Sequence, residues 1–404
     1  MPKSISTDDR TQWRAVVLAL LAALVAVSHL SKTGLALPDL RQDMQLGMVT
    51  AGWIASIFSL TGIGLGLASG TIVDHLGQRH PLIAGLALLA LGSLVGSYST
   101  SGEILLITRT IEGIGFIAVT VSVPVLVIRA SADKNRKMNV TLWSMCLPIG
   151  SAVVLFVSPL IIETLGWRGV WQVTGWLTLI VFIVVAWGLR EVPLPPRPAN
   201  THQHGNIRRT LSVPGPWLAA SAFGFFAILQ QSMSVWLPTF LIEQHGVATA
   251  LAGSLTAVFF LFNGAGNSIA GVLMSWGARR WVLLLTAGLG TGLTAIGAFS
   301  SFLPNEARFL FVLAFSCVGG LLPATIFAAS SDYAPSPAQI GTFNGLIMVG
   351  ISVGQFTGPP AMAAVVSWAG TWDVILWYII ALSLILTTIA LLARRLDKSL
   401  EQKP

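Results

Sequence analysis

Four ionisable residues interrupt two long apolar stretches: His29 and Lys32 in residues 15–37, and Arg109 and Glu112 in residues 104–128. Each pair is three residues apart and therefore shares one face of a helix. The imidazole of His29 titrates near neutrality and can carry a proton. Glu112 can exchange a proton while Arg109 tunes that acid or meets an anionic solute. These residue types at this spacing predict a site for protons and anions.

Structural roles for the same residues remain open. His29 can be a neutral side chain hydrogen-bonded between helices, and Lys32 can extend to lipid headgroups. Arg109 and Glu112 can form an internal ion pair that only holds helices together. A second group of candidates consists of amides in other apolar stretches, which either contact solute or pack helices: Gln230, Gln231, Asn263 and Gln355.

The composition requires a lipid environment for these residues. Of 404 residues, 54% are apolar and 10% are charged, whereas soluble domains carry about 25% charged residues. The basic residues are scattered at segment ends rather than clustered on one face, which argues against nucleic-acid binding. No phosphate-binding loop and no catalytic or metal cluster is recognisable, so we expect neither an enzyme nor a cofactor. The sequence predicts an all-α integral membrane protein.

The elements that must position the candidate residues are membrane-spanning helices. A bilayer core needs about 20 apolar residues per helix. Residues 191–213 are rich in proline and polar groups and read as a solvated linker. This linker separates two predicted domains, residues 1–190 and 214–404. Read this way, the sequence contains twelve segments: 15–37, 47–73, 81–99, 104–128, 139–163, 169–190, 214–240, 248–275, 281–301, 307–330, 339–367 and 373–393.

The two predicted domains resemble each other at an offset of about 200 residues. Arg109 matches Arg308, Pro159 matches Pro359, and the end of the second segment resembles the end of the eighth. Duplication of this kind is typical of transporters. We therefore expect two pseudo-symmetric six-helix bundles.

The basic residues also predict an orientation. All but five of the 23 Lys and Arg residues fall on one side if both termini are cytoplasmic. By the positive-inside rule, this places both termini and the linker in the cytoplasm. We expect the protein in the plasma membrane, which is the inner membrane of a bacterium. The five exceptions are Lys32, Arg41, Arg109, Arg168 and Arg308.

The pattern Gly70-x-x-x-Asp74-x-x-Gly77-x-Arg79 resembles the signature loop between helices two and three of the major facilitator superfamily. The run from Arg109 through Glu112 and Gly113 to Gly115 resembles this family's fourth-helix motif, and Gly166-Trp167-Arg168 is also similar. The resemblance covers the whole chain. Short loops and a length near 400 residues favour the branch of cyanate and nitroimidazole transporters.

This resemblance implies roles for particular residues. Helices one, four, seven and ten would line a central cavity, which favours His29, Lys32, Arg109, Glu112 and one of the two glutamines. Glycine stripes on helices two and eleven would meet across the interface of the bundles: Gly62, Gly64, Gly66 and Gly70, and Gly345, Gly350, Gly354 and Gly358. In the second copy of the signature loop Ser275 replaces the acid, so we expect a charge-based gating network mainly in the first half. Its residues would be Gly70, Asp74, Gly77, Arg79 and Arg129.

Together these features predict a secondary active transporter that moves a small solute by alternating access. Lys32 and Arg109 favour a small organic or inorganic anion, and His29 and Glu112 favour coupling to protons. The alternative is a proton-antiporting exporter of drugs or metabolites. The expected partners are the solute, protons and the lipid bilayer, without nucleic acid, and we expect a functional monomer.

Overall fold

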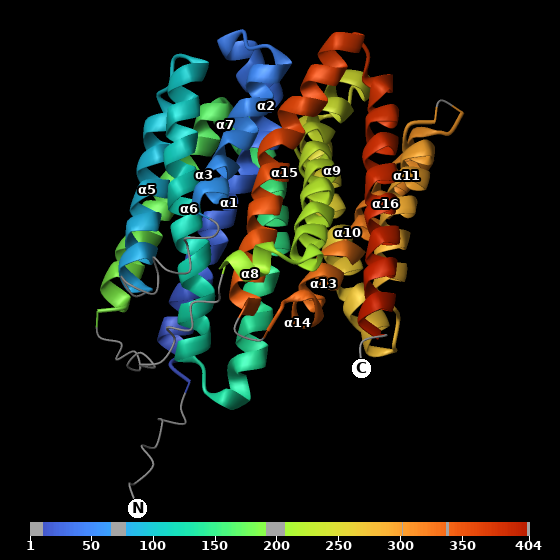
Figure 1. Cartoon of the computed structure of the whole chain (residues 1–404). Coiled ribbons are helices and arrows are strands. Elements are labelled where there is room, and N and C mark those ends of the chain that lie inside the picture. Colours follow the sequence, from blue (N-terminus) through green and yellow to red (C-terminus); the bar gives the residue numbers. More distant parts are fainter. Residues whose placement is uncertain (1–10, 66–77, 191–206, 301, 337–338, 402–404) are drawn as a thin grey trace, which may run out of the picture.

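The computed structural model describes residues 11–65, 78–190, 207–300, 302–336 and 339–401. Throughout these ranges the regular elements are helices (Figure 1). The first half of the chain contains α1 (Trp13–Met44), α2 (Met48–Ser56), the 3-10 turn η1 (Ile57–Ser59), α3 (Leu60–Leu65), α5 (Arg79–Ser97), α6 (Gly102–Ala130) and α7 (Asp133–Gly188).

The second half repeats this plan. It contains α8 (Ile207–Leu211), α9 (Pro214–His245), α10 (Thr249–Ser275), α11 (Arg280–Ala298), α12 (Asn305–Gly319), α13 (Leu321–Ala328), α14 (Ser330–Tyr333), α15 (Ile340–Ala369), η3 (Trp372–Val374) and α16 (Ile375–Glu401).

Each of the twelve predicted segments corresponds to helix over its described residues; residues 66–73 of the second segment and residue 301 of the ninth lie outside the described ranges. Within the described ranges, ten helices are long and apolar enough to cross a membrane, and Met48–Gly64 is a shorter apolar helix. The long helix α7 consists of two helices, because the chain reverses at Gly166. Gly166 has a φ of +66°, a left-handed conformation that glycine adopts without a steric penalty. The second arm of α7 and the α2–α3 segment complete the twelve.

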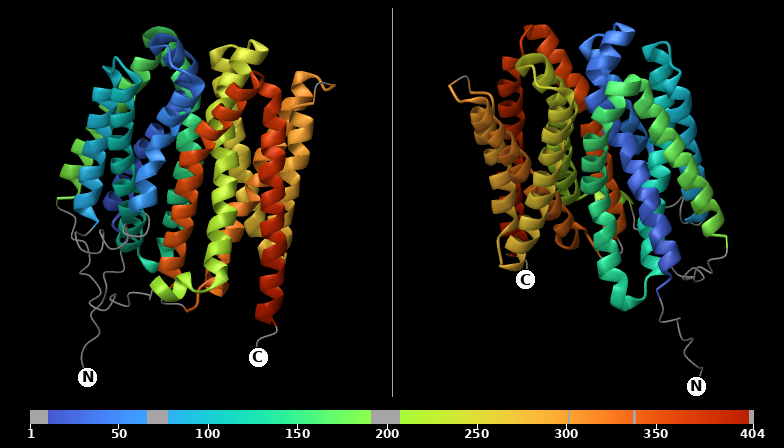
Figure 2. Two further views of the ribbon diagram at one scale, coloured as in Figure 1. Left: turned by 45° about the horizontal axis from the view of Figure 1, so that its top comes forward. Right: turned by 180° about the vertical axis from the view of Figure 1, so that it is seen from behind.

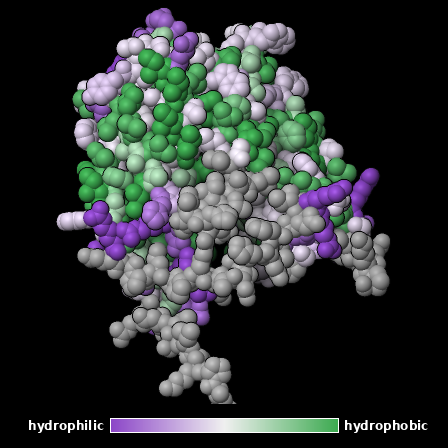
Figure 3. Space-filling model, turned by 60° about the vertical axis from the view of Figure 1, so that its left-hand side comes forward, coloured by the Kyte–Doolittle hydropathy of each residue, from purple (hydrophilic) through white to green (hydrophobic). Residues whose placement is uncertain are grey.

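The halves stand side by side, with the helices roughly parallel to one axis (Figures 1 and 2). The helix α1 begins and α16 ends at the same end of the molecule, which we call the terminal end; the other end is the distal end. Large apolar side chains such as Leu160, Ile180 and Leu293 are exposed on the sides. One side shows an apolar band with hydrophilic residues toward both ends (Figure 3). This pattern fits helices surrounded by lipid.

Close backbone approaches join the two halves. A Cβ atom on Gly52 of α2 would lie 2.9 Å from Cα of Pro360 in α15, and one on Gly253 of α10 would lie 2.6 Å from the carbonyl oxygen of Leu155 in α7. At the distal end Arg41 of α1 forms a 2.7 Å ion pair with Glu243 of α9. Glycine is needed at these contacts because a side chain would separate the helices.

The glycine stripes behave differently from each other. Gly62 of the helix-two stripe faces Ser352 of α15 across the interface, as expected. The prediction for helix eleven was wrong. Gly350, Gly354 and Gly358 of α15 pack against carbonyl oxygens of α9 in the same half, because α15 approaches α9 too closely for side chains there.

The two halves agree more closely in the arrangement of their helices than in the positions of their matching residues. Arg109 is the eighth residue of α6, whereas Arg308, its proposed match, is the fourth residue of α12. Counting from the helix starts, the counterpart of Arg109 is Val312. The pairing of two arginines at equal depth is therefore not reproduced, since Arg308 lies in the first turn.

Candidate functional site

The four ionisable residues predicted from the sequence form one cluster in the first half, which we call the charged cluster. Glu112 lies at its centre: its Oε1 is 2.9 Å from Nζ of Lys32 and its Oε2 is 2.5 Å from Nη1 of Arg109. Nδ1 of His29 is 3.4 Å from the same Oε2. The side chains of Lys32, His29, Arg109 and Glu112 are each 0% exposed. The pairs from α1 and α6 are thus brought together away from solvent.

Uncharged groups from neighbouring helices surround the charged cluster. Nζ of Lys32 donates to Oγ of Ser93 in α5 at 2.8 Å and lies 4.6 Å from the ring centre of Trp171 in α7. Nε2 of His29 is 2.7 Å from Oγ1 of Thr178, also in α7. These contacts place the two α1 side chains on the face toward α5 and α7.

Besides its ion pair with Glu112, Arg109 is held by two backbone carbonyls. Its Nη1 donates to the carbonyl oxygen of His29 at 2.8 Å, and its Nε donates to that of Ile54 at 3.3 Å. The Ile54 carbonyl lies just before η1, where the α-helix tightens into a 3-10 turn. A side chain that bonds a carbonyl of the i→i+4 ladder commonly perturbs the helix in this way. Nη2 of Arg109 is buried and has no hydrogen-bond partner among the described residues.

Glycines provide the space for this arrangement. A Cβ atom on Gly92 of α5 would lie 2.8 Å from Cγ of Glu112 and 2.9 Å from the carbonyl oxygen of Thr108. A Cβ atom on Gly115 would lie 2.6 Å from the carbonyl oxygen of Gly85, and one on Gly113 would collide with the backbone of Phe58. The glycines that follow Glu112 in the sequence therefore let α6 approach α5 and η1.

The charged cluster contains two basic side chains and one carboxylate. Burying charges is costly unless they are paired and hydrogen-bonded. Glu112 compensates one positive charge, and hydroxyl and carbonyl oxygens solvate the remainder. Such an arrangement can hold a proton whose loss would neutralise the excess charge, and it can favour an anion nearby. Among the described residues no group of three His, Cys, Asp or Glu side chains could hold a metal ion.

The predicted amide residues do not join the charged cluster. Nδ2 of Asn263 donates to the carbonyl oxygen of Ser316 at 3.1 Å, a contact between α10 and α12. Gln355 of α15 accepts from Oγ of Ser59 in η1 at 3.3 Å and so connects the halves. Both polar atoms of the Gln230 side chain are buried and lack a partner among the described residues. Gln231 is partly exposed on the same helix.

The predicted gating motif is only partly described. Gly70, Asp74 and Gly77 lie outside the described residues. Arg79 begins α5, and Arg129 in the last turn of α6 donates to Oε1 of Gln78 at 2.8 Å. The two arginines therefore lie at the terminal end, where the signature loop connects to α5.

Sequence reasoning missed Ser93, Thr178 and Trp171, which complete the surroundings of Lys32 and His29. Ser93 and Thr178 lie in apolar helices without a charged neighbour, and Trp171 follows Arg168 by three residues. Small hydroxyl residues and tryptophans are common in membrane helices, so their types carried no signal. The only available hint was the glycine at position 92, next to Ser93.

Comparison with known proteins identifies the family. The family model described as Major Facilitator Superfamily matches residues 16–256 and 240–404. The 4-hydroxybenzoate transporter PcaK of Pseudomonas aeruginosa is 28% identical over 86% of this chain and 73% of its own length. The cyanate transport protein CynX of Escherichia coli is 26% identical over 77% of this chain and 79% of its own length. The predicted similarity to cyanate transporters is thus confirmed as one relationship among several.

An exporter is also among the relatives. The cephamycin export protein CmcT of Amycolatopsis lactamdurans is 25% identical over 91% of this chain and 81% of its own length. A crystal structure of a bacterial homologue of the human lysosomal transporter Spinster has the same fold. It superposes with a TM-score of 0.79 over 95% of this chain and 96% of the other, at 16% identity. The chain therefore belongs to the Major Facilitator Superfamily and is an integral membrane protein for secondary transport of small solutes.

Proposed function

We propose that this transporter moves a small organic or inorganic anion, coupled to protons. The observation that carries the proposal is the charged cluster, in which Lys32 and Arg109 face a single carboxylate, Glu112, without exposure to solvent. In a low-dielectric interior the excess positive charge acts on its surroundings far more strongly than in water. An anion nearby would be attracted, and loss of one proton would weaken that attraction.

Relatives support the anionic class. The names of two of them specify 4-hydroxybenzoate and cyanate, which are both singly charged anions at neutral pH. We therefore place small monocarboxylates first among the candidates. A monoanion needs one compensating positive charge, which is the excess that the charged cluster carries with His29 neutral.

Direct contact with the solute belongs to other residues in this conformation. Nζ of Lys32 is occupied by Ser93 and Glu112, and Nη1 of Arg109 by Glu112 and a carbonyl. Gln355 lies where the halves meet, and Gln230 offers a donor and an acceptor without partners. We propose that these glutamines contact the solute and that the charged cluster supplies charge and coupling. Asn263 is better explained as a packing residue.

We also propose that the terminal end faces the cytoplasm of a bacterial inner membrane. Arg14, Arg79, Arg129, Arg280 and Arg395 all lie toward this end of their helices, in agreement with the positive-inside rule. Labelling of single cysteines introduced at exposed positions near Lys398 and Glu243 in intact cells tests this. A membrane-impermeant reagent should label only the site near Glu243.

Uptake into proteoliposomes tests the transport proposal. Purified protein is supplied with 4-hydroxybenzoate, benzoate or cyanate, with the outside more acidic than the inside. We expect accumulation of at least one anion above equilibrium. Lys32→Met should abolish accumulation, because it removes the excess charge, whereas Lys398→Met on the exposed terminal end should retain it. Exchange of cationic dyes without transport of any tested anion would overturn the proposal.

The second candidate is an exporter of drugs or metabolites that exchanges them for protons. The similarity to a cephamycin export protein over most of the chain favours it. Inside-out and right-side-out vesicles distinguish the two. An exporter accumulates its solute only when the compartment receiving the solute is the more acidic one.

A further inference from the structure

The hydrogen bonds around His29 determine which of its nitrogens carries a proton. The hydroxyl of Thr178 has one hydrogen, and it donates this to the carbonyl oxygen of Thr174 at 2.7 Å. Toward Nε2 of His29, 2.7 Å away, the hydroxyl can then only accept. In the state in which Thr178 donates to Thr174, Nε2 therefore carries the hydrogen. In neutral histidine this leaves a lone pair on Nδ1, which points toward Lys32 and Glu112.

The same reasoning applies to Lys32. The hydroxyl of Ser93 donates to the carbonyl oxygen of Trp171 at 2.7 Å, so it accepts from Nζ of Lys32 at 2.8 Å. A second hydrogen of Nζ is donated to Oε1 of Glu112 at 2.9 Å. The third faces Nδ1 of His29, 3.4 Å away. This third hydrogen can be transferred without breaking the other two bonds.

We propose that Lys32 and His29, and not Glu112, hold the exchangeable proton of this transporter, and that Ser93 and Thr178 are the residues that position it. The step rests on the proposed proton coupling. Lys32 gives its third proton to Nδ1 of His29 and becomes a neutral amine. The imidazole then releases its Nε2 proton to the Thr178 hydroxyl, which passes its own hydrogen to a water molecule that reaches it when the transporter opens, and this water carries the proton away. His29 ends neutral with its hydrogen on Nδ1.

After this cycle the hydrogen bonds around Lys32 and His29 are again satisfied, and only the bond from Thr178 to the Thr174 carbonyl is given up. The neutral amine of Lys32 still donates to Ser93 and Glu112. Nδ1–H of His29 faces the lone pair of Nζ and Oε2 of Glu112, each 3.4 Å away, and the Thr178 hydroxyl turns to donate to Nε2. A network with two complete hydrogen-bond patterns can hold either proton count without an unsatisfied buried group.

The charges around Lys32 and His29 favour the two states of the charged cluster, one with and one without the exchangeable proton. Arg109 of α6 lies 2.5 Å from Glu112 and stabilises its carboxylate. The groups that face His29 and Lys32 from α5 and α7 are uncharged: Ser93, Thr178 and Trp171; α2 contributes only a carbonyl to the cluster, through Arg109. With the proton the charged cluster has one excess positive charge, and without it Arg109 and Glu112 cancel. Binding and release of one proton therefore switch the attraction for a monoanion on and off.

Solid-state NMR of protein labelled with ¹⁵N-histidine in lipid bilayers tests the assignment without any solute. The chain has six histidines, and the His29 signal is identified by its loss in His29→Gln. We expect a neutral Nε2–H tautomer at low pH that converts to the Nδ1–H tautomer as pH rises. Conversion to a doubly protonated imidazolium at low pH, or one unchanged tautomer at all pH values, would overturn the proposal.

Thr178 provides a matched pair of variants. Thr178→Val keeps the shape but removes the hydroxyl, and we expect loss of the tautomer switch and a decrease of about tenfold in gradient-driven 4-hydroxybenzoate uptake. Thr178→Ser keeps the hydroxyl and should retain both. An unchanged switch in Thr178→Val contradicts the positioning role. A tautomer switch in wild-type protein that transports no anion would refute the substrate class but leave the proton assignment intact.

Discussion

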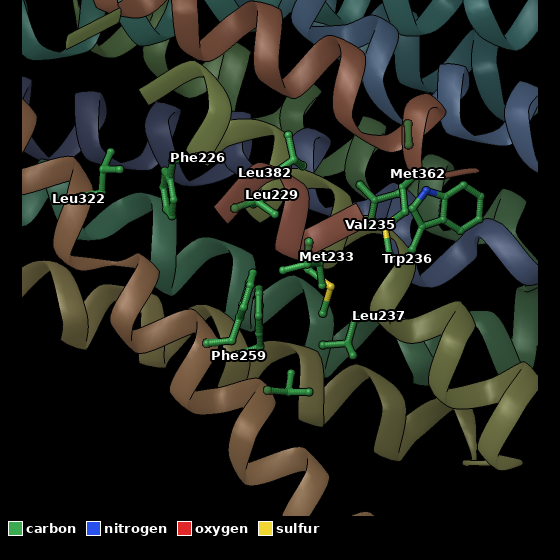
Figure 4. Close-up of a cluster of buried hydrophobic side chains, with 14 of the residues drawn as sticks. Phe226, Leu229, Met233, Val235, Trp236, Leu237, Phe259, Leu322, Met362 and Leu382 are labelled. Atoms are coloured by element: carbon green, nitrogen blue, oxygen red, sulfur yellow. The ribbon is translucent and has the colours of Figure 1, made fainter. Parts of the chain in front are cut away.

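The two halves have the same helices but different interiors. Lys32 is the twentieth residue of α1, and the twentieth residue of α9 is Met233. Glu112 is the eleventh residue of α6, and its counterpart in α12 is Phe315. Met233 and Phe315 are buried, as are the apolar side chains around Met233 in the second half (Figure 4). The scaffold is similar in the two halves, but among the described residues only the first half contains charge at this depth.

Among the described residues, two contacts of charged side chains within the second half lie at the terminal end, whereas Glu243 pairs at the distal end with Arg41 of the first half. Arg280 at the start of α11 pairs with Asp332 of α14, and the hydroxyl of Tyr333 donates to Asp397 of α16 at 2.7 Å. These contacts join helix ends within one half. This difference is our reason for assigning the proposed proton coupling to the first half.

The largest effect should follow from removing the centre of the charged cluster. Glu112→Leu leaves two buried basic side chains without a counter-charge and should decrease the free energy of unfolding by about 3–5 kcal/mol. Thermal denaturation in detergent measures this. The double variant Glu112→Leu/Lys32→Met leaves one cation and should recover part of the loss. The counterpart Phe315→Leu should cost clearly less than Glu112→Leu, and equal losses would remove the distinction between the halves.

Placing a charge in the second half tests whether the apolar interior of that half tolerates the charge that the first half contains. Met233→Lys introduces at the counterpart of Lys32 a cation without a carboxylate, and should destabilise the protein by about 3 kcal/mol. The matched control Met233→Leu keeps volume and polarity and should cost less than about 1.5 kcal/mol. A tolerated lysine would show that the apolar interior of the second half is not required. The measurement is again the melting temperature of the purified protein.

The space around Glu112 gives a smaller effect. Gly92→Ala would bring a methyl group against Glu112 and the Thr108 carbonyl, and should cost about 1–3 kcal/mol through overpacking. Gradient-driven uptake should decrease more than solute exchange, because the carboxylate is displaced. Gly64→Ala in α3 is the control, since nothing lies within 4 Å of its Cβ position. If Gly92→Ala and Gly64→Ala change stability and gradient-driven uptake by the same amount, Gly92 does not position the carboxylate.

Gln230 should give the smallest change in stability. It is the seventeenth residue of α9, as His29 is of α1, and its buried amide lacks partners among the described residues. An unsatisfied buried polar group costs about 1–3 kcal/mol, so Gln230→Met should leave stability equal or raised. If the amide contacts solute, transport should nevertheless decrease. Unchanged transport together with higher stability would exclude that role, and Gln231→Met is the comparison on the same helix.

Much of the fold followed from hydropathy and a few motifs. Twelve apolar segments predicted the twelve helices, and the predicted break between segments five and six falls at the glycine where α7 reverses. The orientation, the domain limits and the monomeric state stay predictions. The glycine stripe of helix eleven was assigned to the wrong neighbour, because a stripe of small residues shows that a helix is approached closely but does not identify the approaching helix.

The candidate site likewise has a part that the sequence predicted and a part that only the structure could show. Sequence alone determined that His29, Lys32, Arg109 and Glu112 needed partners, since an ionisable group in an apolar helix is costly by itself. It also paired them by helical spacing. Only the tertiary structure decided that His29, Lys32 and Arg109 meet at the carboxylate of Glu112, and that the two α1 side chains face α5 and α7, where Ser93 and Thr178 lie within hydrogen-bond distance. The physical reason is that the charge of a side chain follows from the residue type, whereas the direction of its hydrogen bonds depends on which helices pack against that residue.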